Sequence, residues 1–446
     1  MKNLKTLVAH PLFRIFQNPI FLFVMWMCIT LVCCIFKLAQ GRYNNFLIFR
    51  QSYWDALAQI SLYLENLNAY LYGISFTVLI APFAVLPIPL GMILWCLANT
   101  AFLYYAIRKL EPETWKFTLI IWVSANDLYE AMVYQQYNVG IAAMIILAFV
   151  CIEKKKDFWA ALFIVVGTMT KIYGILGLAF ILFSKRKLHL LWGILFWSIV
   201  FFCLPMIYTS PEYVLSQYRD WLEVLIYKNN LNTFCYYTNI SLLGMVRKIS
   251  QVTTYSDLWL IIPGILLFIA PYFRINQYES KSFRLLYLSS VLLFMILFST
   301  GTEGCGYISA MVAVGIWFVN TPTRKKTPVL NITLLIFCIV LTSLSASGIF
   351  PKYVRVNYVS PYALKALPCV FIWLKIVWEQ LTQNFVTALP ASLTETGKRS
   401  RIDIVLPCYN PYEGWEQQLI EKHKELEAML DGYDIRFIVV NDGSKR

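Results

Sequence analysis

Charged side chains are scarce in this sequence, and their scarcity restricts the class of protein that it can encode. Only 14% of the 446 residues are Asp, Glu, Lys or Arg, whereas 59% are hydrophobic and the mean hydropathy is +0.60. Soluble domains carry about 25% charged residues. We therefore exclude a soluble globular protein and predict an integral membrane protein.

Histidine is nearly absent, and the cysteines do not form pairs in the sequence. The chain has three histidines, and its eleven cysteines form no Cys-x-x-Cys motif and lie mostly within apolar runs. Zinc sites and disulfide frameworks require such residues at characteristic spacings. We expect neither a metal nor any other cofactor in the membrane part of the chain.

The net charge of +13 does not indicate a nucleic-acid-binding protein. No stacking or RNA-binding motif accompanies the basic residues. They cluster instead between apolar runs, at 154–156, 185–187 and 324–326. Loops that face the cytoplasm are enriched in Lys and Arg. We therefore expect membrane lipids and not nucleic acid as partners, a multi-pass protein of the inner (plasma) membrane, and both termini in the cytoplasm.

Apolar runs that can form membrane helices occupy most of residues 1–381. About 20 apolar residues cross a bilayer core, and the run at 20–39 meets this length. We predict an all-α, polytopic bundle of about 10–12 helices, and we interpret a run at 116–125 as re-entrant because it is too short to cross. No internal repeat of the transporter kind is apparent. The other apolar runs lie at 73–88, 89–107, 136–152, 158–170, 172–184, 188–208, 257–273, 285–300, 306–319, 329–347 and 361–381.

Two polar segments interrupt the apolar runs on the predicted outer side. Residues 41–73 follow the first run and are rich in aromatic and polar side chains. Residues 209–256 mix aromatic and charged side chains, which predicts an interfacial amphipathic helix. Lys171 lies between two short apolar runs, so we expect it at the tip of a hairpin that points outward.

Ionisable and amide side chains near these segments are candidates for a functional site, because such groups are costly at membrane depth. Carboxylates, amides and cations suit the binding of a sugar and its phosphate, with a carboxylate as general base. Structural explanations remain open for single residues. Lys171 could reach the interface as a snorkelling lysine, Asp55 could be a solvated helix residue, and 135–138 could satisfy a helix start.

Residues 20–380 resemble the polyprenyl-phosphate-sugar-dependent membrane glycosyltransferases of family 87, which have a GT-C fold. The resemblance implies transfer of a sugar from a polyprenyl-phosphate donor to a lipid-linked or glycan acceptor at the outer, periplasmic face, with inversion at the anomeric carbon. It rests on the order and spacing of Leu62-Tyr63, Tyr72-Gly73-Ile74-Ser75-Phe76, Ala81–Pro87, Leu94–Asn99, Gln135–Asn138, Thr170–Tyr173, Asn239–Leu242 and Tyr307-Ile308.

The same resemblance implies a catalytic aspartate just after the first span, where this chain has Asn45. An amide cannot accept the proton of an acceptor hydroxyl. The base is then another carboxylate, with Asp55 as the first candidate and Asp127 or Glu130 next. Otherwise this branch works differently, or the chain is inactive.

The donor phosphate and the sugar need different side chains. We expect Lys171, with Arg219 or Arg247, to hold the phosphate, because this leaving group needs a cation. The remaining candidates would bind the sugar or the donor head group. They are Asn45, Tyr72, Gln135, Gln136, Asn138, Asn239, Ser241 and Glu303.

The composition changes at residue 382. Residues 382–400 read as a cytoplasmic polar linker, and 401–446 have the pattern of a strand, a helix and a second strand, at 402–407, 414–430 and 435–440. This pattern predicts the β-α-β start of a Rossmann-like sheet. Two strands cannot bury their own faces, so we expect an incomplete α/β fragment after the 1–381 bundle.

Residues 401–446 resemble the N-terminal edge of family 2 glycosyltransferases, which have a GT-A fold. The resemblance implies that Asp442 contacts the nucleotide of a sugar donor, and that a divalent metal would be bound only by a complete domain of this family. The matching residues are Val405-Leu406-Pro407-Cys408-Tyr409-Asn410-Pro411 and Val439-Val440-Asn441-Asp442-Gly443-Ser444.

Functions other than sugar transfer remain open at this stage. A transporter or flippase of a lipid-linked saccharide would also need outward polar residues. A non-catalytic fusion remnant carrying a truncated cytosolic transferase would show the same sequence pattern.

Overall fold

The computed structural model describes residues 14–63, 70–233, 235, 238–252, 254–321, 328–386, 400–408, 413–429 and 433–441. The chain divides into two compact units, Met1–Phe385 and Val386–Arg446. The first unit is a bundle of helices. The second consists of two strands and a helix.

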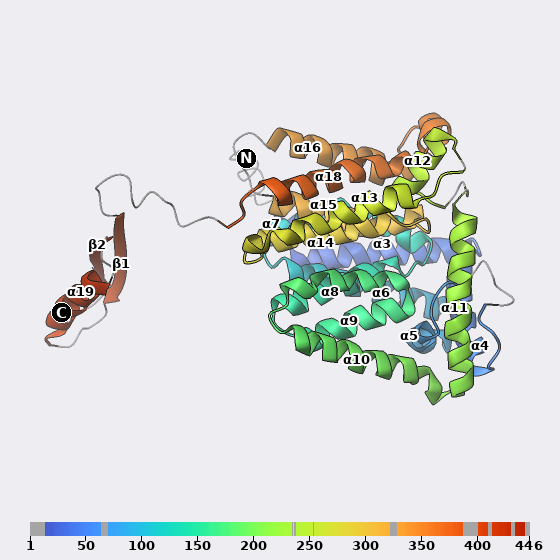
Figure 1. The fold of residues 1–446 in the computed structure, drawn as a ribbon, viewed down its shortest axis with the longest axis horizontal. Coiled ribbons are helices and arrows are strands. Elements are labelled where there is room, and N and C mark those ends of the chain that lie inside the picture. The colour runs from blue at the N-terminus through green and yellow to red at the C-terminus, as the bar shows by residue number, and fades with distance from the viewer. Residues whose placement is uncertain are drawn as a thin grey trace. The chain divides into compact units, whose positions relative to one another are not determined.

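Most long helices of the first unit run alongside one another, while α11 crosses one end of the bundle (Figure 1). The helices are α3 (Pro19–Ala39), α4 (Asn44–Leu57), α5 (Ser75–Ala84), α6 (Ile88–Leu110), α7 (Thr114–Val133), α8 (Asn138–Glu153), α9 (Asp157–Thr170), α10 (Lys187–Cys203), α11 (Pro211–Asn232), α12 (Leu242–Ser250), α13 (Leu258–Ile269), α14 (Lys281–Leu297), α15 (Ile308–Asn320), α16 (Pro328–Phe337), α17 (Lys352–Val354) and α18 (Leu367–Thr382).

Several connections are also helical. A 3₁₀ helix, η2 (Ile172–Phe183), follows α9 after a break at one residue, Lys171. A π-helical turn, η7 (Cys338–Ser343), continues α16. The remaining 3₁₀ and π turns are η1 (Ile15–Gln17), η3 (Leu204–Ile207), η4 (Ala270–Phe273), η5 (Ile275–Gln277), η6 (Gly304–Tyr307), η8 (Leu344–Ala346), η9 (Arg355–Val359) and η10 (Leu364–Ala366).

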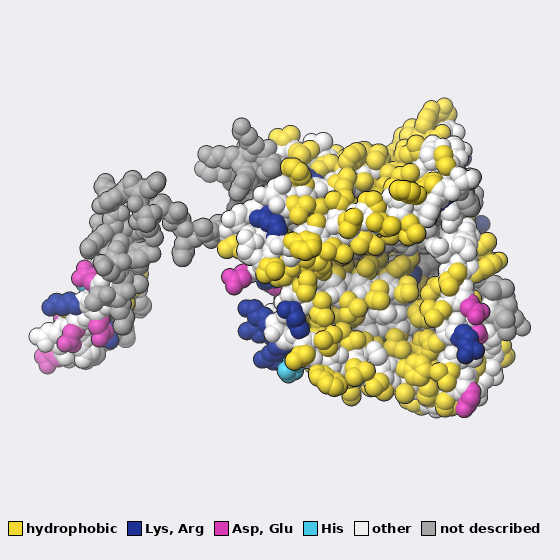
Figure 2. Space-filling view, in the orientation of Figure 1, with side chains coloured by type: hydrophobic (Ala, Val, Ile, Leu, Met, Phe, Trp, Pro, Cys, Tyr) yellow, Lys and Arg dark blue, Asp and Glu magenta, His cyan; other side chains and the backbone are white. Residues whose placement is uncertain are grey.

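The core of the bundle lies around α8 and α15, whose side chains are buried along almost their whole length. A helix that is apolar on all sides is expected in the interior of a large or membrane-embedded bundle. Helix α10 is equally apolar but buries only Leu190 and Gly193. Its exposed face belongs to an apolar surface that covers the flank of the bundle, while Lys and Arg gather at one end (Figure 2). This pattern is typical of a multi-pass membrane protein.

Within the described residues, four helical stretches are long and apolar enough to cross a bilayer, at Pro19–Ala39, Ile88–Leu110, Lys187–Ile207 and Val329–Ala346. A fifth would be a pair of helices bent by 95°, Lys352–Val359 and Leu364–Thr382. Shorter apolar helices fill the rest of the bundle. The all-α membrane architecture is thus confirmed.

The prediction that the segment at 116–125 is short was wrong, because the helix that contains it is longer. Helix α7 is continuous over Thr114–Val133, and its 20 residues rise about 30 Å. The sequence pattern broke off early because the second half of α7 carries polar side chains. Two of these, Ser124 and Asp127, are buried against other helices and are not exposed in a loop.

Helix α11 holds the polar segment that follows α3. The Gln217 side chain accepts a hydrogen bond from the Leu62 backbone (2.9 Å), and the Trp221 indole donates to the Leu71 carbonyl (3.1 Å). The opposite face of α11 exposes apolar side chains such as Leu215, Leu222 and Ile226. The helix therefore has two distinct faces, as an interfacial helix requires.

The second unit contains β1 (Ser400–Cys408), α19 (Trp415–Met429) and β2 (Tyr433–Asn441). The strands pair in parallel, with Ser400 opposite Tyr433. The Arg436 guanidinium forms two hydrogen bonds of 3.0 Å with the Asp403 carboxylate of the neighbouring strand. The three elements lie where the sequence pattern predicted them, but a two-stranded sheet does not establish a Rossmann-like domain.

Gly73 provides a test of how tightly the first polar segment is packed. Its backbone N–H donates to the Thr170 carbonyl (3.1 Å), and an added Cβ would lie 2.1 Å from the Met169 carbonyl oxygen. We expect Gly73→Ala to lower the free energy of unfolding by about 1–3 kcal/mol, the usual effect of forcing extra atoms into a packed site. The measurement is the Tm of the purified protein in detergent. Gly348→Ala is the control, because nothing lies within 4 Å of its added Cβ, and equal Tm values for the two variants would contradict the prediction.

Candidate functional site

The most unusual group of the bundle is the ammonium of Lys171, which lies half-buried in the break between α9 and η2. It donates a hydrogen bond to Asn138 Oδ1 (2.7 Å) and lies 3.5 Å from the Tyr72 hydroxyl. The rings of Tyr72 and Tyr173 flank it, with centroids 5.1 and 5.6 Å from Nζ. Within the described part of the chain, no carboxylate lies within 4 Å of this cation.

Backbone contacts fix the position of Lys171. Helix α9 ends at Thr170, whose carbonyl accepts the Gly73 N–H. Gly167 and Gly174 approach each other so closely that a Cβ on Gly174 would lie 2.1 Å from the Gly167 backbone. The break is therefore locked from two sides, and the lysine side chain has a defined direction.

The turn between α7 and α8 supplies the amide groups. Gln135 adopts a left-handed backbone conformation (φ 51°), and its carbonyl accepts the Trp95 indole N–H (3.2 Å). This conformation lets the chain reverse within a few residues, so that Asn138 begins α8 facing Lys171. The Tyr72 hydroxyl lies 3.4 Å from Gln136 Oε1, close enough to donate to it.

Asn45 also reaches this turn. It lies in the first turn of α4, and its side-chain amide donates to the Tyr134 carbonyl (2.8 Å). Tyr72, Gln135, Gln136, Asn138, Asn45 and Lys171 therefore come from four separate segments and gather at one end of the bundle. We call this group the lysine cluster.

Glu303 is a carboxylate with few partners whose charge acts on the lysine cluster. It lies half-buried between α14 and η6 and acts electrostatically on Lys171 and Tyr72. Its one hydrogen bond to a side chain among the described residues comes from the Cys305 thiol (3.5 Å). This carboxylate can therefore contact a ligand.

Glu130 and Asp127 are engaged elsewhere. Lys365 Nζ lies 2.6 Å from Glu130 Oε2 and 3.9 Å from Asp127 Oδ1. Lys365 also donates to the Gly304 carbonyl (3.2 Å), next to Glu303. Ser343 donates to the second Asp127 oxygen. This buried network holds the loop that carries Glu303.

A cavity of about 520 Å³ lies beside the lysine cluster. Tyr173 links the two, because its ring flanks Lys171 and its hydroxyl hydrogen-bonds Ser299 (2.7 Å) in the cavity wall. The lining comes from the C-terminal end of α11, from α12, from the start of α13 and from residues 298–300. It is of a size that holds a small ligand.

The other predicted site residues lie apart from the lysine cluster. Asp55 accepts a hydrogen bond from Gln51 (2.7 Å) and sits about 15 Å along α4 from Asn45. Arg219 is exposed on α11. Arg247 lines the cavity but is paired with Asp257 (2.6 Å) and stacks on Tyr255. The structure brings neither Asp55 nor Arg219 to Lys171.

Asn239 and Ser241 have a structural part in the same region. The Ser241 hydroxyl donates to Asn239 Oδ1 (2.7 Å) and accepts the Gly244 N–H at the start of α12. The Ile240 backbone between them pairs with Thr302 and Tyr307. These contacts place the segment against the loop of Glu303. A role of Asn239 and Ser241 in substrate binding remains a prediction. Asp442, the predicted nucleotide contact, lies outside the described residues.

Sequence reasoning missed Lys365 and Tyr173. Lys365 stands at the start of an apolar segment, where an isolated lysine marks a functional or paired group, and this signal was overlooked. Tyr173 follows the predicted Lys171 by two residues but carries no signal of its own in a chain with 28 tyrosines.

A family model described as Glycosyltransferase family 87 matches residues 70–300, more than half of the chain. The matched segment contains Tyr72, Gln136, Asn138 and Lys171, and ends three residues before Glu303. Lys365 lies outside it. No curated protein and no solved structure matched the chain.

The Lys365 network gives a prediction about stability. Removing one partner of a buried ion pair costs about 3–5 kcal/mol, so we expect Lys365→Met to lower the Tm in detergent by several degrees or more. Lys352→Met, at an exposed lysine, should leave the Tm unchanged. Adding Glu130→Gln to Lys365→Met should restore part of the loss, because a neutral amide is less costly to bury than a carboxylate. A double variant no more stable than Lys365→Met would contradict this explanation.

Proposed function

Because the chain belongs to glycosyltransferase family 87, we propose that this membrane glycosyltransferase takes its sugar from a polyprenyl-phosphate donor. The acceptor would be a glycan or glycolipid at the outer, periplasmic face of the inner membrane, with both chain termini in the cytoplasm. The observation that carries the proposal is Lys171, a half-buried cation without a carboxylate partner within 4 Å among the described residues.

The surroundings of Lys171 favour an anionic ligand. A buried ammonium is costly unless it is paired. Asn138 and the two tyrosine rings replace only part of the hydrogen bonding that water would provide to it. A phosphate oxygen would complete its coordination. It would also place the leaving group of the reaction beside a fixed positive charge, which stabilises negative charge developing in the transition state.

Glu303 is the carboxylate best placed to act as the base, in preference to Asp55, Asp127 and Glu130. Asp127 and Glu130 both contact the ammonium of Lys365, and Asp127 also accepts a hydrogen bond from Ser343, so both carboxylates are already engaged within the protein. Asp55 lies at the far end of α4 from Asn45. Glu303 has few partners and lies near Lys171 and Tyr72.

The reaction follows from this arrangement. Glu303 accepts the proton of the acceptor hydroxyl, and the acceptor oxygen forms a bond to the anomeric carbon. The bond from that carbon to the donor phosphate oxygen breaks, and its electron pair stays on the polyprenyl phosphate beside Lys171. Attack from the side opposite the leaving group inverts the anomeric centre. Asn45, Gln136 and Asn138 would orient the sugar through hydrogen bonds.

The cavity beside Tyr173 is the proposed space for the acceptor. It adjoins the lysine cluster through the Tyr173 ring and the Ser299 hydroxyl, and its wall combines polar and apolar side chains. Such a lining suits a saccharide carried on a lipid, because sugars present both hydroxyl groups and apolar faces.

We propose that the second unit is related to family 2 transferases and lies in the cytoplasm. The support is its parallel β1-α19-β2 arrangement together with the sequence around Pro407 and Asn441. A nucleotide-sugar transferase on the cytoplasmic side would supply chemistry that complements the membrane unit.

The phosphate assignment is tested by Lys171→Met. The assay incubates the purified protein with a panel of radiolabelled polyprenyl-phosphate hexoses and pentoses and a membrane lipid extract as acceptor. We expect the variant to lose transfer by about 10²–10³-fold, the usual loss when one stabilising group for developing charge is removed. Lys352→Met, at an exposed lysine that begins α17, is the matched control. Full turnover by folded Lys171→Met would overturn the assignment.

The choice of base is tested by comparing Glu303→Gln with Asp55→Asn. Loss of a general base lowers kcat by about 10²–10⁴-fold, and we expect this loss for Glu303→Gln with little change in KM. Asp55→Asn should retain most of its activity. The opposite pattern, with kcat lost in Asp55→Asn and kept in Glu303→Gln, would make Asp55 the base.

A further inference from the structure

A second cavity lies at the end of the bundle opposite Lys171. It measures about 430 Å³ and is formed where α6 and α8 end and α14 begins. Helix α8 separates the two sites, because Asn138 at its first residue belongs to the lysine cluster and Glu153 at its last lines this cavity. The distance along the helix is about 22 Å.

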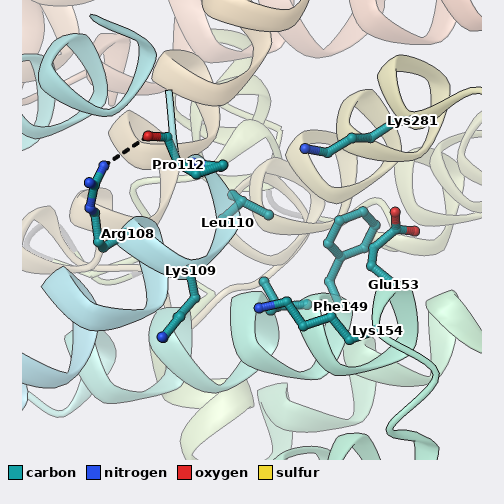
Figure 3. A pocket seen from close by; sticks show the side chains of 9 residues that line it. Arg108, Lys109, Leu110, Pro112, Phe149, Glu153, Lys154 and Lys281 are labelled. Atoms are coloured by element: carbon teal, nitrogen blue, oxygen red, sulfur yellow. Dashed lines mark hydrogen bonds between the residues drawn. The ribbon is translucent and has the colours of Figure 1, made fainter. Parts of the chain in front are cut away.

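Cations from three helices converge on this cavity. Lys109 comes from the end of α6, Lys154 follows the last residue of α8, and Lys281 is the first residue of α14. The amino groups of Lys154 and Lys281 reach toward the C-terminal end of α6 (Figure 3). Arg108 adds a fourth cation, which donates to the Pro112 carbonyl (3.0 Å).

Nearby carboxylates are already occupied. Glu153, the one acidic residue in the lining, forms a bidentate pair with Arg284 at 2.6 and 2.8 Å. Glu111 accepts a hydrogen bond from Asn320 (2.8 Å), and Glu113 pairs with Lys116 (3.0 Å). Among the described residues, Lys109, Lys154 and Lys281 form no ion pair within 4 Å.

Lys281 lies at the N-terminal end of α14. The N-terminal end of a helix carries partial positive charge, so a cation is stabilised there less than at a C-terminal end. Lys109 and Lys154 lie at helix C-terminal ends, where the partial negative charge of the helix dipole stabilises a cation. The charges of Glu111 and Glu113 act on Lys281 without forming an ion pair within 4 Å. An anion in the cavity would lie closer to its ammonium, where backbone N–H groups at the helix N-terminus also favour negative charge.

Apolar residues alternate with the charged ones in the lining of the cavity. The apolar ones are Leu110, Pro112, Phe149 and Val150. A free inorganic anion gains no contact energy from apolar side chains. A lipid presents a phosphate next to its glycerol and acyl groups, which can pack against them. From this combination we propose that the cavity binds the phosphate head group of an anionic phospholipid.

The test measures binding to the full-length protein in detergent micelles. The probes are dioctanoyl phosphatidic acid, dioctanoyl phosphatidylcholine and inorganic phosphate, followed by isothermal titration calorimetry. We expect phosphatidic acid to bind more tightly than the other two. The triple variant Lys109→Gln, Lys154→Gln, Lys281→Gln should weaken its binding by at least about tenfold, which corresponds to about 1.4 kcal/mol.

A matched control removes the same number of charges outside the cavity. The triple variant Lys155→Gln, Lys185→Gln, Lys187→Gln changes exposed lysines that do not line it, and should bind phosphatidic acid like the unchanged protein. Equal weakening in the two triple variants would overturn the proposal, because net charge alone would then explain binding. Inorganic phosphate binding as tightly as phosphatidic acid would overturn the assignment to a lipid. If the cavity variant loses its unfolding transition, Lys281→Gln alone carries the same test.

Discussion

The position of one positive charge, on Lys171, governs the architecture around the candidate site. An ammonium within an apolar bundle is costly unless polar groups surround it. Here the groups come from the turn before α8, from Tyr72 and from Tyr173. Each of these segments is fixed in turn by backbone contacts, so the cation is held in place by the fold and remains available for an anion.

A second buried cation, Lys365, has the opposite character. It is saturated by Glu130, Asp127 and the Gly304 carbonyl. The two lysines therefore have different roles at this end of the bundle. Lys365 fixes the loop between α14 and α15, which carries Glu303, and the charge of Glu303 acts on Lys171. Lys365 thus forms ion pairs that hold the structure, whereas Lys171 remains available to bind a ligand.

The sequence was sufficient for the helical membrane class, for most helix positions and for grouping Lys171 with the turn at 135–138. These features depend on local hydropathy and on short motifs. The sequence did not predict the full length of α7, whose second half is polar yet buried. It also did not predict that Asp55 lies apart from Lys171. Both depend on which faces of distant helices meet, and hydropathy does not contain that information. The pairing of Lys365 with Glu130, across 235 residues, was missed for the same reason.

The winding of η2 has a consequence for the depth of the candidate site. Its twelve residues form a 3₁₀ helix, which rises about 2.0 Å per residue and so extends about 24 Å. The same residues in an α-helix would extend about 18 Å. With the far end of η2 held by the packing of Phe183 against Tyr278 and Tyr287, the tighter winding carries Lys171 about one helical turn further along the bundle axis. The level at which the lysine meets its ligand is therefore set by helix type as well as by segment length.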